Sequence, residues 1–335
     1  MSITAGVLPL VLAKSSVVWP NSMVEADFMP EYVTMQAIAA QQTANVSTIN
    51  LPDGVDVKLT WLNNCDLTVD TCVDNVCTFT GAEADVSSQT LSIDQCKEVL
   101  FSEKIDIWRD NIYGQADAIA VNLNKAMKQH LEQVAQYSIG VINANLGVNE
   151  YTNGGAWTVN STETLIPAGE WSDTGIFGKL RRAAKKNRLD TPYILDGENL
   201  DQLIYMAKTN AQNGEGKGDN FRAGEMPVYT DLFNVDEVND PALITYLINR
   251  GALAFASKGY FPTVPEKLTD TYMRFSVPNR WFPQLIHDVE VNRTCTAGVW
   301  QDNYRVKARY KLFVNPTGCT ATRTGMLAFT KESGI

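Results

Sequence analysis

The sequence predicts an α+β protein in which one long helix lies among short strands. Residues 110–144 contain no proline, and their apolar residues recur mostly every three or four positions, the period of an α-helix. Residues 304–314 alternate apolar and basic side chains, the period of a half-buried strand. The rest of the chain has short strand-like runs separated by loops. One long helix in a strand-built chain is typical of a subunit of a larger assembly.

Composition bounds the class of protein before any motif is considered. The chain has 335 residues, of which 44% are hydrophobic, so it can bury a sizeable core in one elaborate domain or two. Its 28 basic and 38 acidic residues give a net charge of −10, which argues against a general nucleic-acid binder. The apolar run at residues 7–13 is too short to span a membrane and has no basic residue before it, so we expect a chain made in the cytosol without a membrane segment.

The first 90 residues predict an arm and a hairpin. Residues 1–50 contain three prolines and a short helical stretch around 31–43, so we expect an extended N-terminal arm. Residues 51–90 predict an extended hairpin loop with Asp74 and Asn75 at its tip, because both residue types tolerate positive φ.

The six cysteines do not follow the paired spacing of a zinc site. A two-residue turn at the hairpin tip places Cys72 opposite Cys77, where their Cβ atoms come near disulfide distance. Free thiols in a reducing cytosol and a Cys72–Cys77 disulfide formed after release from the cell therefore remain alternatives.

Residues 91–145 predict a strand that leads into the long helix. On this helix Leu123, Met127 and Leu131 share one face, and we expect that face to pack against the sheet that contains residues 304–314. Lys125 and Lys128 point elsewhere, because each residue turns the helix by about 100°.

Residues 146–284 carry mixed α/β signals, and residues 285–335 hold the final long strand. The middle region predicts an amphipathic helix at 176–188 with Asp173 as its N-cap, and a second helix at 199–210. A flexible loop is expected at 211–220, and short strands are expected at 191–195, 226–230, 242–247 and 251–256.

No set of side chains predicts catalysis, a cofactor or a metal ion. His130 and His287 are best explained as structural or surface residues, and no G-x-S-x-G elbow is present. The glycine-rich run at 214–218 departs from a phosphate-binding loop, and three aspartates on one strand face fit a solvated face better than a calcium loop. The basic residues of 179–188 allow three interpretations: a solvated face, which is the commonest, a contact with phosphate, or a contact with an acidic neighbouring subunit.

The order of these parts resembles the major capsid protein of tailed double-stranded DNA phages, with the Hong Kong 97-like fold. The resemblance rests on the strand and turn of 92–112, the long helix of 116–143, the strand at 191–196, the stretch from Phe221 to Tyr229, and the last strands at 251–256 and 304–316. It implies an N-terminal arm (1–50), an extended hairpin loop (51–90), a peripheral domain with the spine helix (91–145), an axial domain (146–284) and a return to the peripheral domain (285–335).

The resemblance also implies a function without catalysis. The expected protein assembles with copies of itself as hexamers and pentamers in an icosahedral shell, inside the host bacterial cytoplasm, and becomes the capsid of the virion. It encloses DNA without sequence-specific binding, and its expected partners are portal, scaffolding and decoration proteins. Two alternatives stay open: an encapsulin-like compartment of the same fold, and an unrelated α/β enzyme.

Overall fold

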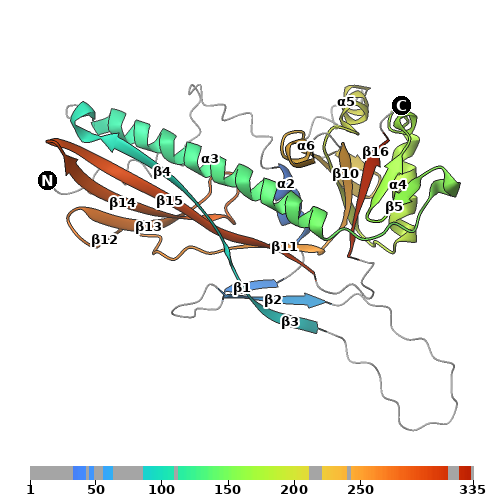
Figure 1. The fold of residues 1–335 in the computed structure, drawn as a ribbon, viewed down its shortest axis with the longest axis horizontal. Coiled ribbons are helices and arrows are strands. Elements are labelled where there is room, and N and C mark those ends of the chain that lie inside the picture. The colour runs from blue at the N-terminus through green and yellow to red at the C-terminus, as the bar shows by residue number, and fades with distance from the viewer. Residues whose placement is uncertain are drawn as a thin grey trace, which may run out of the picture. The chain divides into compact units, whose positions relative to one another are not determined.

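The computed structural model describes residues 33–42, 45–48, 56–62, 86–108, 112–210, 221–239, 243–315 and 324–332. The chain divides into two compact units, and Figure 1 shows the elements of both. The first unit comprises Met1–Gln36, Ser92–Ser138 and Phe255–Leu312, and the second comprises Ala37–Leu91, Ile139–Ala254 and Phe313–Ile335. Helices and mostly antiparallel strands occur in both units, which confirms the predicted α+β class.

The first unit is a six-stranded sheet with one long helix. The helix α3 (Ile112–Ala144) has 33 residues and is therefore about 50 Å long. The strands run in the order β11-β15-β14-β13-β12, and β4 pairs with β15. Their bounds are β4 (Gln95–Lys104), β11 (Leu253–Ser257), β12 (Glu266–Lys267), β13 (Tyr272–Pro278), β14 (Ile286–Thr296) and β15 (Val299–Val314), and the 3₁₀ turn η2 (Ile105–Trp108) follows β4.

Strands β14 and β15 form a long antiparallel hairpin. Thr296 pairs with Val299, so only Ala297 and Gly298 lie between the strands. Both turn residues have positive φ, 51° and 79°, as a two-residue turn of this hand requires. The alternation predicted for 304–314 therefore belongs to a strand that begins five residues earlier, at Val299.

The second unit contains a seven-stranded mixed sheet in the order β5-β6-β16-β10-β7-β9-β8. The pairs β16–β6 and β7–β9 are parallel, and the other four pairs of this sheet are antiparallel. The strands are β5 (Thr158–Asn160), β6 (Glu163–Ile166), β7 (Pro192–Asp196), β8 (Phe221–Ala223), β9 (Met226–Thr230), β10 (Ile244–Asn249) and β16 (Met326–Lys331). The helices and turns are η3 (Asn153–Gly155), η4 (Ala168–Glu170), α4 (Gly175–Lys186), α5 (Asp201–Asn210) and α6 (Asn234–Asn239), and α2 (Val33–Gln41) ends in this unit.

Helix α4 packs on this sheet through its apolar stripe. Ile176, Leu180, Ala183 and Ala184 are buried in one cluster with strand residues such as Phe329. The expected N-cap differs by one position, because Thr174 occupies the cap and makes no side-chain cap bond. The carboxylate of Asp173 instead accepts a hydrogen bond from the Gly175 amide at 3.0 Å.

A small three-stranded sheet contains β1 (Asn45–Thr48), β2 (Asp56–Leu62) and β3 (Val86–Ser92), in that order. Strands β2 and β3 are neighbours, so the two ends of the segment 63–85 start from adjacent strands. That segment holds the predicted hairpin tip, Asp74 and Asn75, and the predicted disulfide pair, Cys72 and Cys77. These four residues lie outside the described residues.

The domain bounds expected from the sequence stay a prediction, and sheet pairing crosses them at two places. Strands β11 to β13, from the region 146–284, join the sheet of the first unit, where β13 pairs with β14 over seven residues. Strand β16, from the segment 285–335, pairs with β10 in the second unit. Sheet pairing between distant residues decides both assignments, and chain order does not reveal it.

Candidate functional site

The first candidate surface is the contact between α3 and the sheet of the first unit. Leu123 and Met127 are each 2% exposed, and Leu131 is fully buried. Leu123 and Met127 belong to one apolar cluster with Phe275 of β13, Val289 of β14 and Val306 of β15. Figure 1 shows α3 running alongside β4, β14 and β15. Lys125 is exposed, as expected for a residue on the opposite side of the helix.

A buried histidine pair joins α3 to β14. The Nδ1 atoms of His130 and His287 are 3.2 Å apart, and the rings stack with centroids 5.2 Å apart. Asn279 is the third member of the group. Its side-chain oxygen accepts hydrogen bonds from the amides of Trp281 and Phe282, so its nitrogen must be the donor to His287 Nε2 at 3.0 Å.

This orientation fixes the protons of the pair. His287 accepts at Nε2, so in its neutral form it carries its proton on Nδ1 and donates it to Nδ1 of His130. His130 then carries its proton on Nε2, and that atom has no partner among the described residues. Burial lowers the pKa of His130 to about 4, and burial together with the neighbouring imidazole lowers the pKa of His287 well below its usual value. Both rings are therefore neutral near pH 7.

A buried ion pair ties β14 to β15. Arg293 donates from Nε and Nη2 to the two carboxylate oxygens of Asp302, at 2.7 and 2.8 Å. The two side chains are only 6% and 4% exposed. The two residues are direct register partners, so the bidentate pair fixes this hairpin at one position along its length.

The basic face of β15 is matched by carboxylates of neighbouring strands. Arg305 pairs with Glu98 at 2.8 Å, and Lys307 pairs with Glu290 at 3.2 Å. The remaining two cations of this face have partners at 2.6 and 2.7 Å, in the pairs Arg309–Asp288 and Lys311–Asp94. The alternating cations predicted from the sequence therefore form a ladder of ion pairs across the sheet, and their charge is not free to hold a phosphate backbone.

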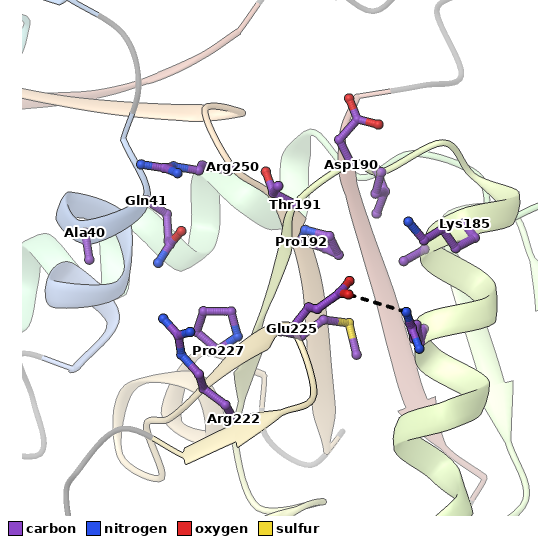
Figure 2. A pocket seen from close by; sticks show the side chains of 14 residues that line it. Ala40, Gln41, Lys185, Asp190, Thr191, Pro192, Arg222, Glu225, Pro227 and Arg250 are labelled. Atoms are coloured by element: carbon purple, nitrogen blue, oxygen red, sulfur yellow. Dashed lines mark ion pairs between the residues drawn. The ribbon is translucent and has the colours of Figure 1, made fainter.

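The second unit has a cavity of about 470 Å³ beside α4 (Figure 2). Its wall comes from the end of α2, from α4, from the loop that leads into β7, from β8 and β9, and from the end of β10. Four cations and two carboxylates are among the lining residues: Arg181, Lys185, Arg222, Arg250, Asp190 and Glu225. Gln41 at the end of α2 is held in place by a hydrogen bond to the hydroxyl of Tyr229 at 3.2 Å.

Other classes of site are absent from the part of the chain that the structure describes. No three His, Cys, Asp or Glu side chains there come together as metal ligands. No helix within those residues is both long enough and apolar enough to cross a bilayer. Cys96 and Cys295 are exposed free thiols.

Several solved structures from phages contain a similar chain. No protein-family model matches the sequence, and no curated protein matches it. The capsid of cyanophage P-SCSP1u is similar with a TM-score of 0.46 and 12% identity, over 94% of this chain and 91% of that one. A structure from Mycobacterium phage Bobi gives 0.45 and 12%, over 95% and 96%, and the capsid of Staphylococcus phage Andhra gives 0.45 and 8%, over 86% and 83%. All three TM-scores are below 0.5, so the function proposed below is derived from the chain's own geometry.

The structure thus locates three of the seven residues singled out by the sequence. Leu123, Met127 and Leu131 are buried on α3, whereas the cysteine pair and the hairpin tip fall outside the described residues. The histidine pair and the cavity of the second unit were not predicted as sites. The two histidines are 157 residues apart in the sequence, and the cavity draws its wall from five separate segments, so no local spacing signals either one.

Proposed function

We propose that this chain is the major capsid protein of a tailed phage, a structural subunit that assembles with copies of itself into a closed shell around double-stranded DNA. The observation that carries the proposal is the order of the described elements. Strands β2 and β3 flank a long connection, β4 leads into the 33-residue α3, a separate α/β unit follows, and β14 and β15 return to the sheet under α3.

The segment between β2 and β3 supports an extended hairpin that reaches a neighbouring copy. Asp74 is twelve residues from Leu62, the end of β2, and twelve residues from Val86, the start of β3. The turn predicted at Asp74 and Asn75 is therefore midway between two adjacent strands, where the tip of a symmetrical hairpin belongs. In this proposal Cys72 and Cys77 face each other near the tip and form a disulfide once the particle leaves the cell.

The electrostatics of the described residues suit a container. The cations of β15 are matched by carboxylates, and the whole chain has a net charge of −10. The face of β15 is therefore poorly suited to binding DNA tightly, because tight binding to DNA needs cations left free for phosphates. The proposed partners are other copies of the chain in hexamers and pentamers, together with portal, scaffolding and decoration proteins in the host cytoplasm.

Sedimentation velocity of the purified full-length chain tests this function. A shell subunit is expected to sediment as large closed particles, or to convert to them when a scaffolding protein is supplied. A chain that stays monomeric under both conditions would contradict the proposal and favour the unrelated α/β enzyme.

The contents of purified particles distinguish a phage capsid from an encapsulin-like compartment. Particles of a phage capsid are expected to contain double-stranded DNA and no enclosed enzyme. Particles that contain a cargo protein and no DNA would contradict the capsid and support the compartment.

A further inference from the structure

The cavity beside α4 concentrates positive charge in an acidic protein. Arg181 and Lys185 line it from α4, while Arg222 and Arg250 line it from β8 and from the end of β10. Figure 2 shows Arg222 and Arg250 on one side of the cavity and Lys185 on the other. An anion inside the cavity would thus have cations on both sides.

Internal carboxylates balance only part of this charge. Glu225 pairs with Arg181 at 3.6 Å, and both side chains are largely exposed, 79% and 58%. Among the described residues, Lys185, Arg222 and Arg250 have no ion pair. The cations of β15 contrast with them, because each of those has a carboxylate within 4 Å. The cavity therefore offers three exposed cations to a ligand that brings its own carboxylates.

The sequence contains one segment with the matching charge. Residues 63–85 contain five acidic side chains and no lysine or arginine. The acids are spread along the segment, so an extended chain presents them at intervals and not as one cluster: Asp66, Asp70, Asp74, Glu83 and Asp85.

We propose that the basic cavity of one copy receives the acidic segment 63–85 of a second copy. This inference rests on the proposed function, which requires repeated contacts between identical chains. The cavity is then the surface that binds the predicted hairpin. The guanidinium groups of Arg181, Arg222 and Arg250 and the ammonium of Lys185 would pair with its carboxylates. Ion pairs between exposed groups give specificity and orientation, and added salt weakens them.

A peptide-binding experiment tests the cavity directly. The probe is a fluorescent synthetic peptide of residues 63–85 with serine in place of its three cysteines. The receptor is the full-length chain with Asp66→Asn, Asp70→Asn, Asp74→Asn, Glu83→Gln and Asp85→Asn, so that its own segment does not compete. Fluorescence anisotropy is expected to show saturable binding that weakens with added salt, and a peptide with the same five neutralising changes is expected not to bind.

Helix α4 offers a matched control for the receptor. Arg181→Gln with Lys185→Gln removes two cations that line the cavity, and Arg182→Gln with Lys186→Gln removes two exposed cations of the same helix that do not. The first double variant is expected to weaken binding about tenfold or more, and the second by less than about twofold. Arg250→Gln, outside the helix, is expected to weaken binding in the same direction, and thermal melting verifies that each variant is folded.

Several results would overturn the inference. They are absence of binding, equal losses in the two double variants, and a short DNA duplex that binds the cavity more tightly than the peptide does. Shell formation by the unmodified chain is scored separately by sedimentation. Shells without cavity-dependent binding refute the inference and leave the proposed function standing, whereas cavity-dependent binding by a chain that never forms shells refutes the proposed function alone.

Discussion

At the scale of single residues, the buried histidine pair of the first unit contributes to how stability responds to pH. The histidine pair is neutral in the folded protein, with the pKa of His130 lowered to about 4 and that of His287 well below its usual value. In the unfolded chain both imidazoles titrate near pH 6.5. Between about pH 6.5 and pH 4 these two histidines bind more protons in the unfolded state, so their contribution to the free energy of unfolding falls as the pH falls. Asp196 and Asp236 of the second unit act in the opposite direction, because burial raises their pKa values to about 7 and about 6.

The expected size of this effect is large enough to measure. Each histidine contributes at most about 1.4 kcal/mol per pH unit, and only about half of that near its unfolded pKa, so the pair destabilises the fold by about 3 kcal/mol between pH 6.5 and pH 5. Denaturant unfolding at a series of pH values measures it as the difference between two proteins, because the variant His130→Gln with His287→Asn should lose less stability as the pH falls. Identical pH slopes for the two proteins would show that the pair is not the group that titrates.

The Arg293–Asp302 pair gives a second prediction at this scale. Asp302→Asn leaves the guanidinium of Arg293 buried at 6% exposure without its charged partner, and should lower the free energy of unfolding by about 3–5 kcal/mol. Replacing both residues, as Arg293→Met with Asp302→Leu, should cost much less, because no unpaired charge remains. Urea titrations compare the three proteins, and a double variant as unstable as Asp302→Asn would show that packing, and not the unpaired charge, explains the loss.

At the scale of elements, the packing of α3 on the sheet of the first unit determines the stability of that unit. Leu123 is 2% exposed and lies in the cluster with β13, β14 and β15, so Leu123→Ala should lower the free energy of unfolding by about 2–5 kcal/mol and reduce shell yield as well. Lys125→Ala, two residues along the same helix and exposed, should change stability by less than about 0.5 kcal/mol. Equal melting temperatures for the two variants would contradict the packing of this helix face.

The segment between β2 and β3 is tested by removing its outer part. Deletion of residues 68–81 leaves both strands and five residues of connection on the β2 side and four on the β3 side, so the subunit should still fold. It should fail to form stable shells, because the proposed contact with a neighbouring copy is lost. Thermal melting and sedimentation measure the two properties separately, and normal shells from the shortened chain would refute the role given to the hairpin.

The sequence predicts well those elements whose own residues show a clear helical or strand period. The helical period of 110–144 matches α3, Ile112–Ala144, to within two residues, and the alternation of 304–314 lies within β15. The start of β15 was missed because its turn uses Ala297 at positive φ, a position where asparagine, aspartate or glycine is the usual signal. The strand β16 was also missed, because five of its six residues are buried and a short apolar run has no period to read.

The sites are harder to predict than the elements, because most of them form only when distant segments pack together. Leu123, Met127 and Leu131 follow from the helical period alone. His130 and His287 meet only when α3 packs on β14, and Arg222 and Arg250 meet Lys185 only when β8, β10 and α4 assemble. Contacts made by tertiary folding leave no local pattern in a single sequence.

At the scale of the whole molecule, the proposed role of the chain is that of one subunit in a shell. Among the described residues, the long helix and the matched ion pairs stabilise the subunit, and the basic cavity is the surface proposed to contact a second copy. Large permanent interfaces bury roughly 2,000–5,000 Å² or more, and contacts of that size are expected between the copies in a shell.

Electron microscopy of particles formed by the full-length chain is the sharpest test of the proposed shell. We expect closed icosahedral shells built from hexamers and pentamers, with density for residues 63–85 of one copy reaching a neighbouring copy. Particles of irregular or open form, or a homogeneous population of single subunits when scaffolding protein is present, would contradict it.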